Sequence, residues 1–275
     1  MNMLESLVNQ APLFLLVAVR CFAAVMSLPL LSSRSLPRAA KVALAGFLAF
    51  FVFPRVSLSS GQFAAYAPYI SASGNFDLVY VLLLAGEALI GIILGFMVQL
   101  VFAAFSTAGQ FFAFQMGLSA SEVYDSLSQV ENPIMGQFFN FMAILVFLQS
   151  GWMSRFLLDG VLQSFDALNV FSVLSHTEEL ARFMMRSLSS LFADAFIIAL
   201  PVMASLFLIN VTVGILSKAA PQMNLLSEGF PILMLTAYFL ITHLVPLFID
   251  FFGACIQDGF ASIERLFIMM NGGAS

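Results

Sequence analysis

The sequence feature that most limits the possible folds is a long apolar stretch over residues 78–115, in which Glu87 is the only charged residue. As one α-helix this stretch would be about 57 Å long, at 1.5 Å per residue. The hydrocarbon core of a bilayer is only about 30 Å thick. A helix of this length must therefore tilt, break or extend beyond the membrane.

The rest of the chain has the same apolar character. Hydrophobic residues make up 61% of the sequence, charged residues 9%, and the mean hydropathy is +1.01. A soluble domain carries about 25% charged residues, which this chain could not supply to a water-facing surface. We therefore predict an all-α, multi-helix integral membrane protein. The further candidate spans are residues 12–31, 42–53, 133–150, 188–216 and 230–252. Between them we expect a polar loop over about residues 57–75, and an amphipathic or loop region with mixed charge over residues 151–186.

Several functional classes find no support in the sequence. The net charge of −5 argues against nucleic-acid binding, which needs clustered Lys and Arg. Cys21 and Cys255 lie in apolar stretches, and neither they nor the isolated His176 and His243 have metal-site or disulfide spacing. No nucleophile elbow, P-loop or zinc motif occurs. We expect no enzyme activity, no catalytic residue, no cofactor and no metal.

The short loops predict an orientation. Arg34, Arg38 and Lys41 place the first connection in the cytoplasm and the N-terminus outside. Six crossings then return the turn at Lys218 to the cytoplasm. By the same count residues 116–132 would be cytoplasmic too, although they contain no Lys or Arg.

Residues 116–132 therefore differ from an ordinary cytoplasmic loop. They carry Glu122, Asp125 and Glu131 among Gly, Met and Ser residues. One reading is a re-entrant segment covered by protein, since irregular backbone survives at membrane depth only in such a setting. In that reading the segment forms a deformable constriction in a wide pore, and the alternative is a plain loop between helices.

Two further patterns lie within the apolar stretches. Gly91 and Gly95 form a GxxxG motif near Gly86, which predicts tight helix packing in an assembly, with chance spacing as the alternative. Four ionisable residues lie in or beside apolar stretches, where pairing within the protein is favoured over an ion pathway. They are Arg20, Glu87, Asp194 and Asp250.

Four segments together resemble the FliR family, export-gate membrane proteins of the bacterial flagellar type III secretion apparatus. They include Leu28-Pro29-Leu30-Leu31-Ser32 within residues 20–46, and Glu87-Ala88-Leu89-Ile90-Gly91 within 87–96. They also include Gln115-Met116-Gly117-Leu118-Ser119 within 107–119, and Ala220-Pro221-Gln222-Met223-Asn224 within 220–232. The resemblance covers nearly the whole chain.

The resemblance implies one subunit of a helical export gate in the bacterial inner membrane, at the flagellar basal body. Its partners would be FliP, FliQ and FlhB homologues, lipid and unfolded flagellar export substrates. It also implies inclined helical hairpins, with a FliP-like part over residues 1–187, a FliQ-like hairpin over 188–256 and a C-terminal tail over 257–275.

The resemblance further implies roles for particular residues. A pore plug maps onto residues 116–132, where many members have Asp-Pro but this chain has Asp125-Ser126. The expected plug residues are Met116, Gly117, Leu118, Ser119, Glu122, Asp125 and Asn132. The expected cytoplasmic hairpin tip includes Lys218, Pro221 and Gln222.

Two alternatives stay open. The homologous subunit of a virulence injectisome would share the same sequence features. A stand-alone solute transporter is a different class, which inverted repeats and midplane polar pockets would favour.

Overall fold

The structure is a computed structural model that describes residues 3–32, 36–70, 77–118, 134–219 and 225–270. Every element in these ranges is helical, and they contain no strand, which confirms the predicted all-α fold. The chain divides into two compact units. Unit 1 comprises Met1–Gln99, Gly151–Ser187 and Asp258–Ser275, and unit 2 comprises Leu100–Ser150 and Leu188–Gln257.

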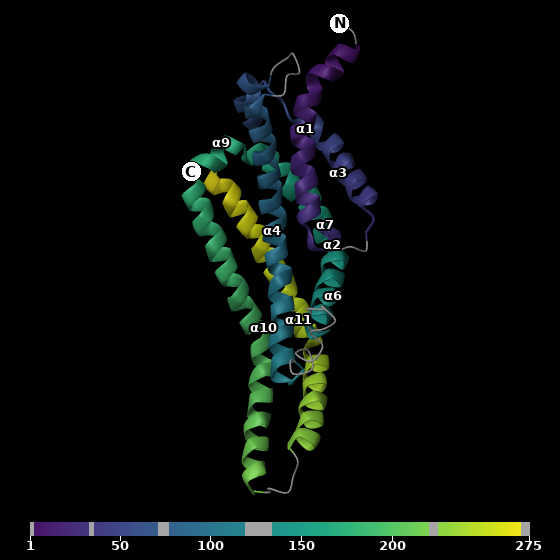
Figure 1. The fold of residues 1–275 in the computed structure, drawn as a ribbon, viewed down its shortest axis with the longest axis vertical. Helices are drawn as coiled ribbons and strands as arrows, with labels where there is room; N and C mark the ends of the chain where they lie inside the picture. Colours follow the sequence, from purple (N-terminus) through teal and green to yellow (C-terminus); the bar gives the residue numbers. More distant parts are fainter. Residues whose placement is uncertain (1–2, 33–35, 71–76, 119–133, 220–224, 271–275) are drawn as a thin grey trace. The chain divides into compact units, whose positions relative to one another are not determined.

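Unit 1 begins with helix α1 (Met3–Ser27), which packs along α3 (Arg38–Val52) (Figure 1). The apolar side chains of α1 recur every three or four residues, so one stripe of the helix is buried, as at Leu16 and Ala24. The shorter helical segments of this unit are α2 (Pro29–Ser32), η1 (Phe53–Arg55), η2 (Gln62–Tyr69), α7 (Trp152–Arg155), η4 (Phe156–Gly160), α8 (Val161–Ala167) and α9 (Val170–Ser175).

The apolar stretch that dominates the sequence forms one helix, α4 (Leu78–Gln115), without the break that the sequence had left open. A carboxylate oxygen of Asp77 accepts a hydrogen bond from the Leu78 N–H at 2.7 Å, which favours a helix start at this point. The first part of α4, as far as Gln99, belongs to unit 1, and the remainder belongs to unit 2.

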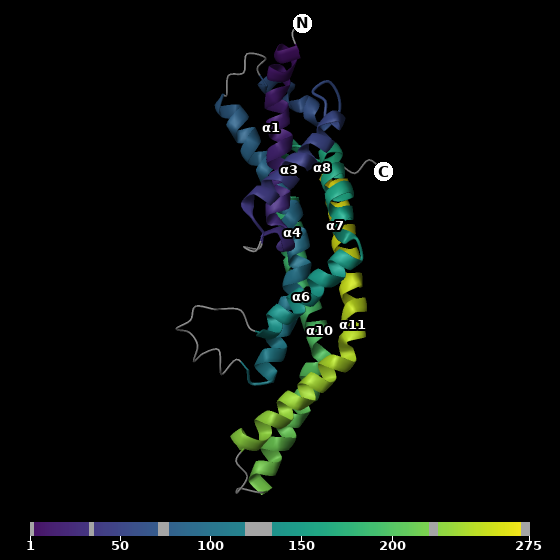
Figure 2. The ribbon, with the colours of Figure 1, turned by 90° about the vertical axis from the view of Figure 1, so that its right-hand side faces the viewer.

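Unit 2 combines the second part of α4 with α6 (Ile134–Gln149) and with portions of two long helices, α10 (Thr177–Ala219) and α11 (Leu225–Met270). The portions of α10 and α11 in this unit form an antiparallel hairpin (Figures 1 and 2). Its core is built from phenylalanine rings, with centroid distances of 4.5 Å for Phe105–Phe252 and 5.3 Å for Phe139–Phe248. These edge-to-face contacts hold α4, α6 and α11 together.

The number of candidate membrane spans is smaller than the predicted six. Among the described residues, four helices are long and apolar enough to cross a membrane, or five if the bent pair Ile134–Gln149 and Trp152–Ala167 counts as one span. The candidate at residues 42–53 is the one that fails, because α3 has only 15 residues. A helix of that length covers about 22 Å.

Residues 151–186 are more ordered than the sequence suggested. We expected an amphipathic or loop region, but α7, η4, α8, α9 and the beginning of α10 occupy it. Asn169 explains part of this difference, because its side chain accepts a hydrogen bond from Ser172 N–H at 2.7 Å and starts α9. Helix α11 likewise continues to Met270, through much of the range 257–275.

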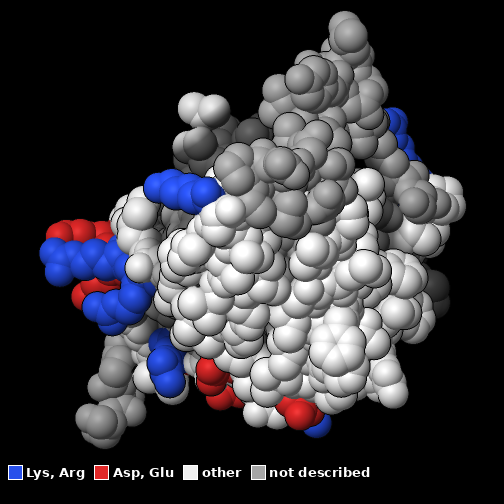
Figure 3. Space-filling model, turned by 90° about the horizontal axis from the view of Figure 1, so that it is seen from below, with Lys and Arg blue, Asp and Glu red and all other residues white. Residues whose placement is uncertain are grey.

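The long helices differ in how far the chain itself covers them. In the most apolar stretch of α4, 61% of the residues are buried, against 22% in α10 and 22% in α11. Seen from below in Figure 3, the molecule shows few charged side chains, most of them at the edges of the view. Lipid or other proteins must therefore cover much of α10 and α11.

Candidate functional site

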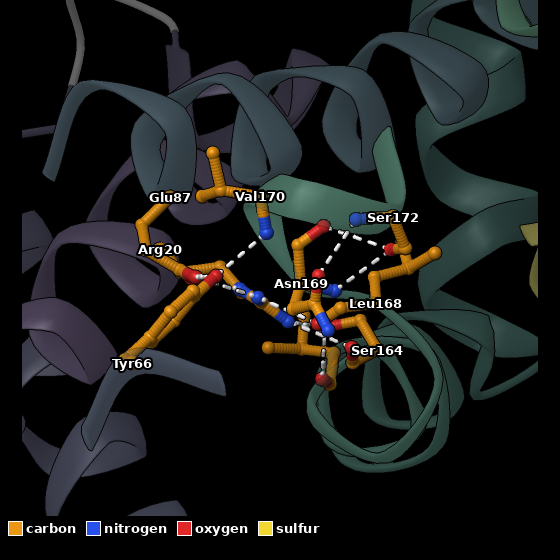
Figure 4. Close-up of polar contacts among 9 residues, drawn as sticks. Arg20, Tyr66, Glu87, Ser164, Leu168, Asn169, Val170 and Ser172 are labelled. Carbon is orange, nitrogen blue, oxygen red and sulfur yellow. Dashed lines mark hydrogen bonds and ion pairs between the residues drawn. The ribbon is translucent and has the colours of Figure 1, made fainter. Parts of the chain in front are cut away.

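A buried guanidinium group forms the centre of the most polar site in unit 1. The Arg20 side chain of α1 is fully buried and donates five hydrogen bonds, the full capacity of a guanidinium (Figure 4). Nε and Nη2 bind the two carboxylate oxygens of Glu87 on α4, the second at 3.0 Å. This fork-to-fork pairing is the strongest geometry for an arginine and a carboxylate.

The remaining donors of Arg20 bind the end of α8. Nη1 donates to the Ser164 carbonyl at 2.7 Å and to its hydroxyl at 3.4 Å, and Nη2 donates to the Leu168 carbonyl at 3.0 Å. The carbonyls at the C-terminus of a helix lack partners within the helix and attract a cation. Arg20 therefore satisfies the end of α8 while it neutralises Glu87.

Tyr66 of η2 completes the coordination of Glu87. Its hydroxyl donates to the carboxylate at 2.6 Å and accepts from the Val170 N–H at 2.6 Å (Figure 4). Burial raises the pKa of Tyr66 well above its ordinary value, and the neighbouring Glu87 charge raises it further. Tyr66 is therefore protonated at neutral pH and acts as a donor to the carboxylate.

Aromatic side chains enclose the ion pair. The guanidinium carbon of Arg20 lies 4.3 Å from the ring centroid of Phe165 and 5.4 Å from that of Phe63. The faces of these rings attract the cation and exclude water from it. Beside them, Asn169 donates to the side-chain oxygen of Gln62 at 2.6 Å and so ties η2 to α9.

This arrangement joins α1, η2, α4 and the α8–α9 region, and we name it the Arg20–Glu87 clamp. Its polar side chains are Arg20, Gln62, Tyr66, Glu87, Ser164 and Asn169. No buried side-chain polar atom in the described residues lacks a partner. A fully satisfied network is suited to holding helices in register, and the pairing of Arg20 with Glu87 agrees with the pairing expected from the sequence.

Glycines of α4 allow α1 to approach closely beside the clamp. A Cβ atom at Gly91 would lie 2.8 Å from the Ala23 Cβ and 2.9 Å from the Ala24 nitrogen, and one at Gly95 would lie 3.1 Å from the Ala24 oxygen. Gly86 faces Val170, whose Cγ1 would be 2.6 Å away. These contacts are within one chain, and the predicted role of the three glycines in an assembly stays a prediction.

The expected plug begins where α4 ends, in unit 2. Gly117 has φ of +78°, a left-handed conformation that favours glycine. The Leu118 N–H donates to the Ala113 carbonyl at 3.0 Å and the Gly117 N–H to the Phe114 carbonyl at 3.1 Å, which is a Schellman motif. Met116 is buried and Leu118 is half-buried. The expected plug residues Ser119, Glu122, Asp125 and Asn132 lie outside the described residues.

The expected hairpin tip is described only in part. Lys218 lies in the last turn of α10, where its charge suits the negative end of the helix dipole. Pro221 and Gln222 fall outside the described residues. Gly229, near the start of α11, lies next to α10, since a Cβ atom there would be 3.2 Å from the Val213 Cγ1.

Sites for a metal or cofactor have little support. In the described part of the chain no three His, Cys, Asp or Glu residues are grouped closely enough to hold a metal ion. A hollow in unit 1 is lined by apolar side chains only. Its lining residues are Ile90, Ile93, Leu168, Val173, Leu180, Leu266 and Met270.

Sequence reasoning missed most of the clamp. Arg20 and Glu87 were singled out, but Tyr66 and Ser164 lie in regions that looked like loops. Their contacts join residues between 21 and 144 positions apart, and no local pattern reports such distances. Asn169 followed by Ser172 is a helix-start signature that could have been found.

The comparisons with known proteins agree with one another. The sequence profile described as "Bacterial export proteins, family 1" matches residues 11–259. Over 240 residues the chain is 32% identical to the flagellar biosynthetic protein FliR of Bacillus subtilis, which covers 86% of this chain and 88% of that protein. It is 30% identical over 238 residues to FliR of Escherichia coli K12, with coverage of 85% and 84%.

A relative with a different printed name is also similar. The "surface presentation of antigens protein SpaR" of Shigella sonnei is 35% identical over 170 residues. The match covers 62% of this chain and 64% of that protein.

Proposed function

This chain belongs to the FliR family of bacterial export proteins, and we propose that it is one subunit of the gate through which flagellar proteins are exported. It is a membrane-embedded component of an export apparatus, and such an apparatus is a hetero-oligomer. In our proposal the gate lies in the bacterial inner membrane at the flagellar basal body. Its substrates are unfolded flagellar proteins.

The observation that carries this proposal is the family match over residues 11–259, nearly the whole chain. The limited burial of α10 and α11 supports it, because only 22% of each apolar stretch is buried within the chain itself. Partner subunits can cover part of that surface. We propose homologues of FliP, FliQ and FlhB as these partners, with residues 1–187 as the FliP-like part and 188–256 as the FliQ-like hairpin.

We also propose that residues 116–132 plug the pore at rest. The Schellman motif at Gly117 supports the beginning of this segment, because it ends α4 and turns the chain away from the helix axis. The acidic and Ser-rich composition of the segment, without Lys or Arg, supports the rest. The subunit gates the passage and performs no bond chemistry, so partners supply the energy.

Deletion of the gene in a flagellated host tests the main proposal. We expect loss of motility and loss of flagellar proteins from the culture medium, both restored by the full-length chain. Purification of a tagged chain in mild detergent should recover several different partner chains. Normal export in the deletion strain, or a chain that purifies alone, would contradict the proposal.

Removal of residues 119–131 tests the plug. Without the plug the closed gate should conduct ions, while secretion remains possible because the helices that form the passage are intact. The measurement is the ion leak of cells that carry the variant, against cells with the same number of residues replaced by a Gly-Ser linker. An unchanged leak in the deletion would argue against the plug assignment.

A second candidate is supported by the similarity to SpaR. In this reading the chain serves a virulence injectisome instead of a flagellum. Motility separates the two, because loss of the gene would then leave swimming unchanged while secretion by the other system stops.

A further inference from the structure

Four polar residues of α11 recur at intervals of seven within unit 2. They are Thr236, His243, Asp250 and Gln257, and we name them the polar stripe. Seven residues of an α-helix make almost two turns, so the four side chains lie along one line of the helix. Asp250, His243 and Gln257 are exposed, and Thr236 is half-buried.

The polar stripe lies opposite the buried face of α11. Phe248 and Phe252, which contact rings of α4 and α6, are 2% and 1% exposed. At 100° per residue they lie roughly 160–200° around the helix from Asp250. The stripe therefore points away from the core of unit 2.

Asp250 has no partner in the described chain. No described residue gives its carboxylate a hydrogen bond or a cation. Lys218 is the only Lys or Arg of unit 2, and it lies at the far end of the hairpin. Asp250 is 25 positions beyond Leu225, where α11 begins, which corresponds to about 37 Å of helix.

The position of Asp250 makes this lack of a partner costly. It lies in the middle of the candidate span Gly229–Met270, among apolar residues. A charged side chain at membrane depth faces protein or water and is paired there, because lipid does not solvate it. The described residues supply no cation for Asp250, so its counterpart is expected to be a cation of another chain, or water.

The residues between the stripe positions favour a second helix over water. Phe239 is exposed, and its ring centroid lies 4.2 Å from that of His243. It therefore presents an apolar side chain beside the polar stripe. A Cβ atom at Gly253 would have no neighbouring atom within 4 Å, so another backbone has room to approach. Phe239, Pro246 and Gly253 also lie seven positions apart, each three positions after a residue of the polar stripe. Such a repeat is the spacing of a helix–helix seam. A water-filled channel needs no such period.

We propose that the polar stripe is a docking seam for one helix of a different chain, and that this helix presents a lysine or arginine to Asp250. A second copy of this chain does not fit. Copies in one membrane share an orientation, so symmetric packing would place Asp250 against Asp250. The inference rests on the proposed function only in assuming a hetero-oligomeric assembly.

Site-specific photo-crosslinking in the full-length chain, in its native membrane, tests the seam. A photoreactive phenylalanine is placed at position 239 or 243, which leaves Asp250 intact, and at 258 as the control, since Asp258 is an exposed acid on another face of α11. We expect positions 239 and 243 to yield a protein adduct with a chain of different mass, and position 258 to yield none of that adduct. An adduct with a second copy, or with lipid only, would overturn the proposal.

Charge variants test the cation. Each charge variant is combined with the photoreactive residue at position 243. Asp250→Lys should abolish recovery of the crosslinked partner, Asp250→Asn should reduce it, and Asp258→Lys should leave it unchanged. Full recovery of the crosslinked partner with Asp250→Lys would refute the pairing. Copurification of partners and continued export in that variant would not rescue it. Absence of every partner from the wild-type chain would instead contradict the proposed function.

Discussion

The two units solve the problem of charge in an apolar environment in different ways. Unit 1 contains nine of the ten basic residues, and it buries Arg20 against Glu87 with every donor satisfied. Unit 2 has Lys218 alone, and it packs its core from phenylalanine rings. On its exposed surface Asp250 has no partner among the described residues.

This difference separates what the chain stabilises by itself from what it leaves to others. The Arg20–Glu87 clamp is complete within one chain, so unit 1 should hold its helices in register without help. The apolar surface of α10 and α11 is left for lipid or other proteins to cover. Substitutions in the clamp should therefore lower the stability of the chain, whereas substitutions in the polar stripe should act on assembly.

The largest effect is expected from breaking the clamp on one side only. Arg20→Ala would leave the Glu87 carboxylate buried without its cation and the Leu168 carbonyl without the donor from Arg20. Loss of one partner of a buried ion pair costs about 3–5 kcal/mol. The measurement is the midpoint of unfolding of the purified chain in detergent, together with its level in membranes.

A double substitution sharpens this result. Arg20→Met with Glu87→Leu removes both charges and keeps the apolar volume, so it should recover much of the loss, because no unpaired charge remains. If Arg20→Ala left the unfolding midpoint unchanged, the clamp would not stabilise unit 1 and the comparison of the two units would fail.

The next effect concerns close helix packing in unit 2. A Cβ atom at Gly109 would lie 2.7 Å from the Gly136 Cα and from the Met135 oxygen, both backbone atoms that cannot rotate away. Gly109→Ala should therefore destabilise the chain by about 1–3 kcal/mol. Gly214→Ala is the matched control, since nothing lies within 4 Å of its Cβ, and it should be neutral or stabilising in isolation. Equal effects of the two changes would show that α4 and α6 do not pack this closely.

A smaller effect is expected from Tyr66→Phe. The change removes one donor to Glu87 and one acceptor for the Val170 N–H, which costs about 1–2 kcal/mol for the polar groups left unpaired. The raised pKa of Tyr66 adds a pH dependence. Because the folded state holds this proton more tightly, the contribution is complete below the ordinary tyrosine pKa of about 10 and is lost above it.

The pH dependence can be measured on the same two proteins. The stability difference between wild type and Tyr66→Phe should shrink as the pH rises above about 10. A difference that stayed constant across that range would mean that the hydroxyl does not titrate with folding.

The sequence predicted the parts of this fold that are determined locally. Residues 78–115 form one helix because an unbroken apolar stretch has no competing structure in a membrane. Residues 151–186 were misjudged because α7, α8 and α9 are short, and short helices are held by tertiary contacts more than by propensity. Asn169 gave a local signal, whereas the hydrogen bond from Arg20 to the Leu168 carbonyl spans 148 positions.

The same limit applies to the candidate sites. Arg20 and Glu87 stood out as charges in apolar stretches, since such charges need a partner. That they are each other's partner follows only from the approach of α1 to α4 at Gly91. The polar stripe is visible as a period of seven in the sequence, but its exposure is a property of the fold.

The smallest effect is expected at an exposed ion pair of unit 1. Arg182 and Glu178 pair across one turn of α10, with side chains 75% and 80% exposed. Water screens this pair, so Arg182→Ala should change stability by no more than about 0.5 kcal/mol. Measured beside Arg20→Ala, it separates the effect of burial from the loss of an arginine as such. A loss of stability in Arg182→Ala as large as that in Arg20→Ala would mean that the stability of unit 1 depends on its total charge. The clamp would then not explain the contrast between the two units.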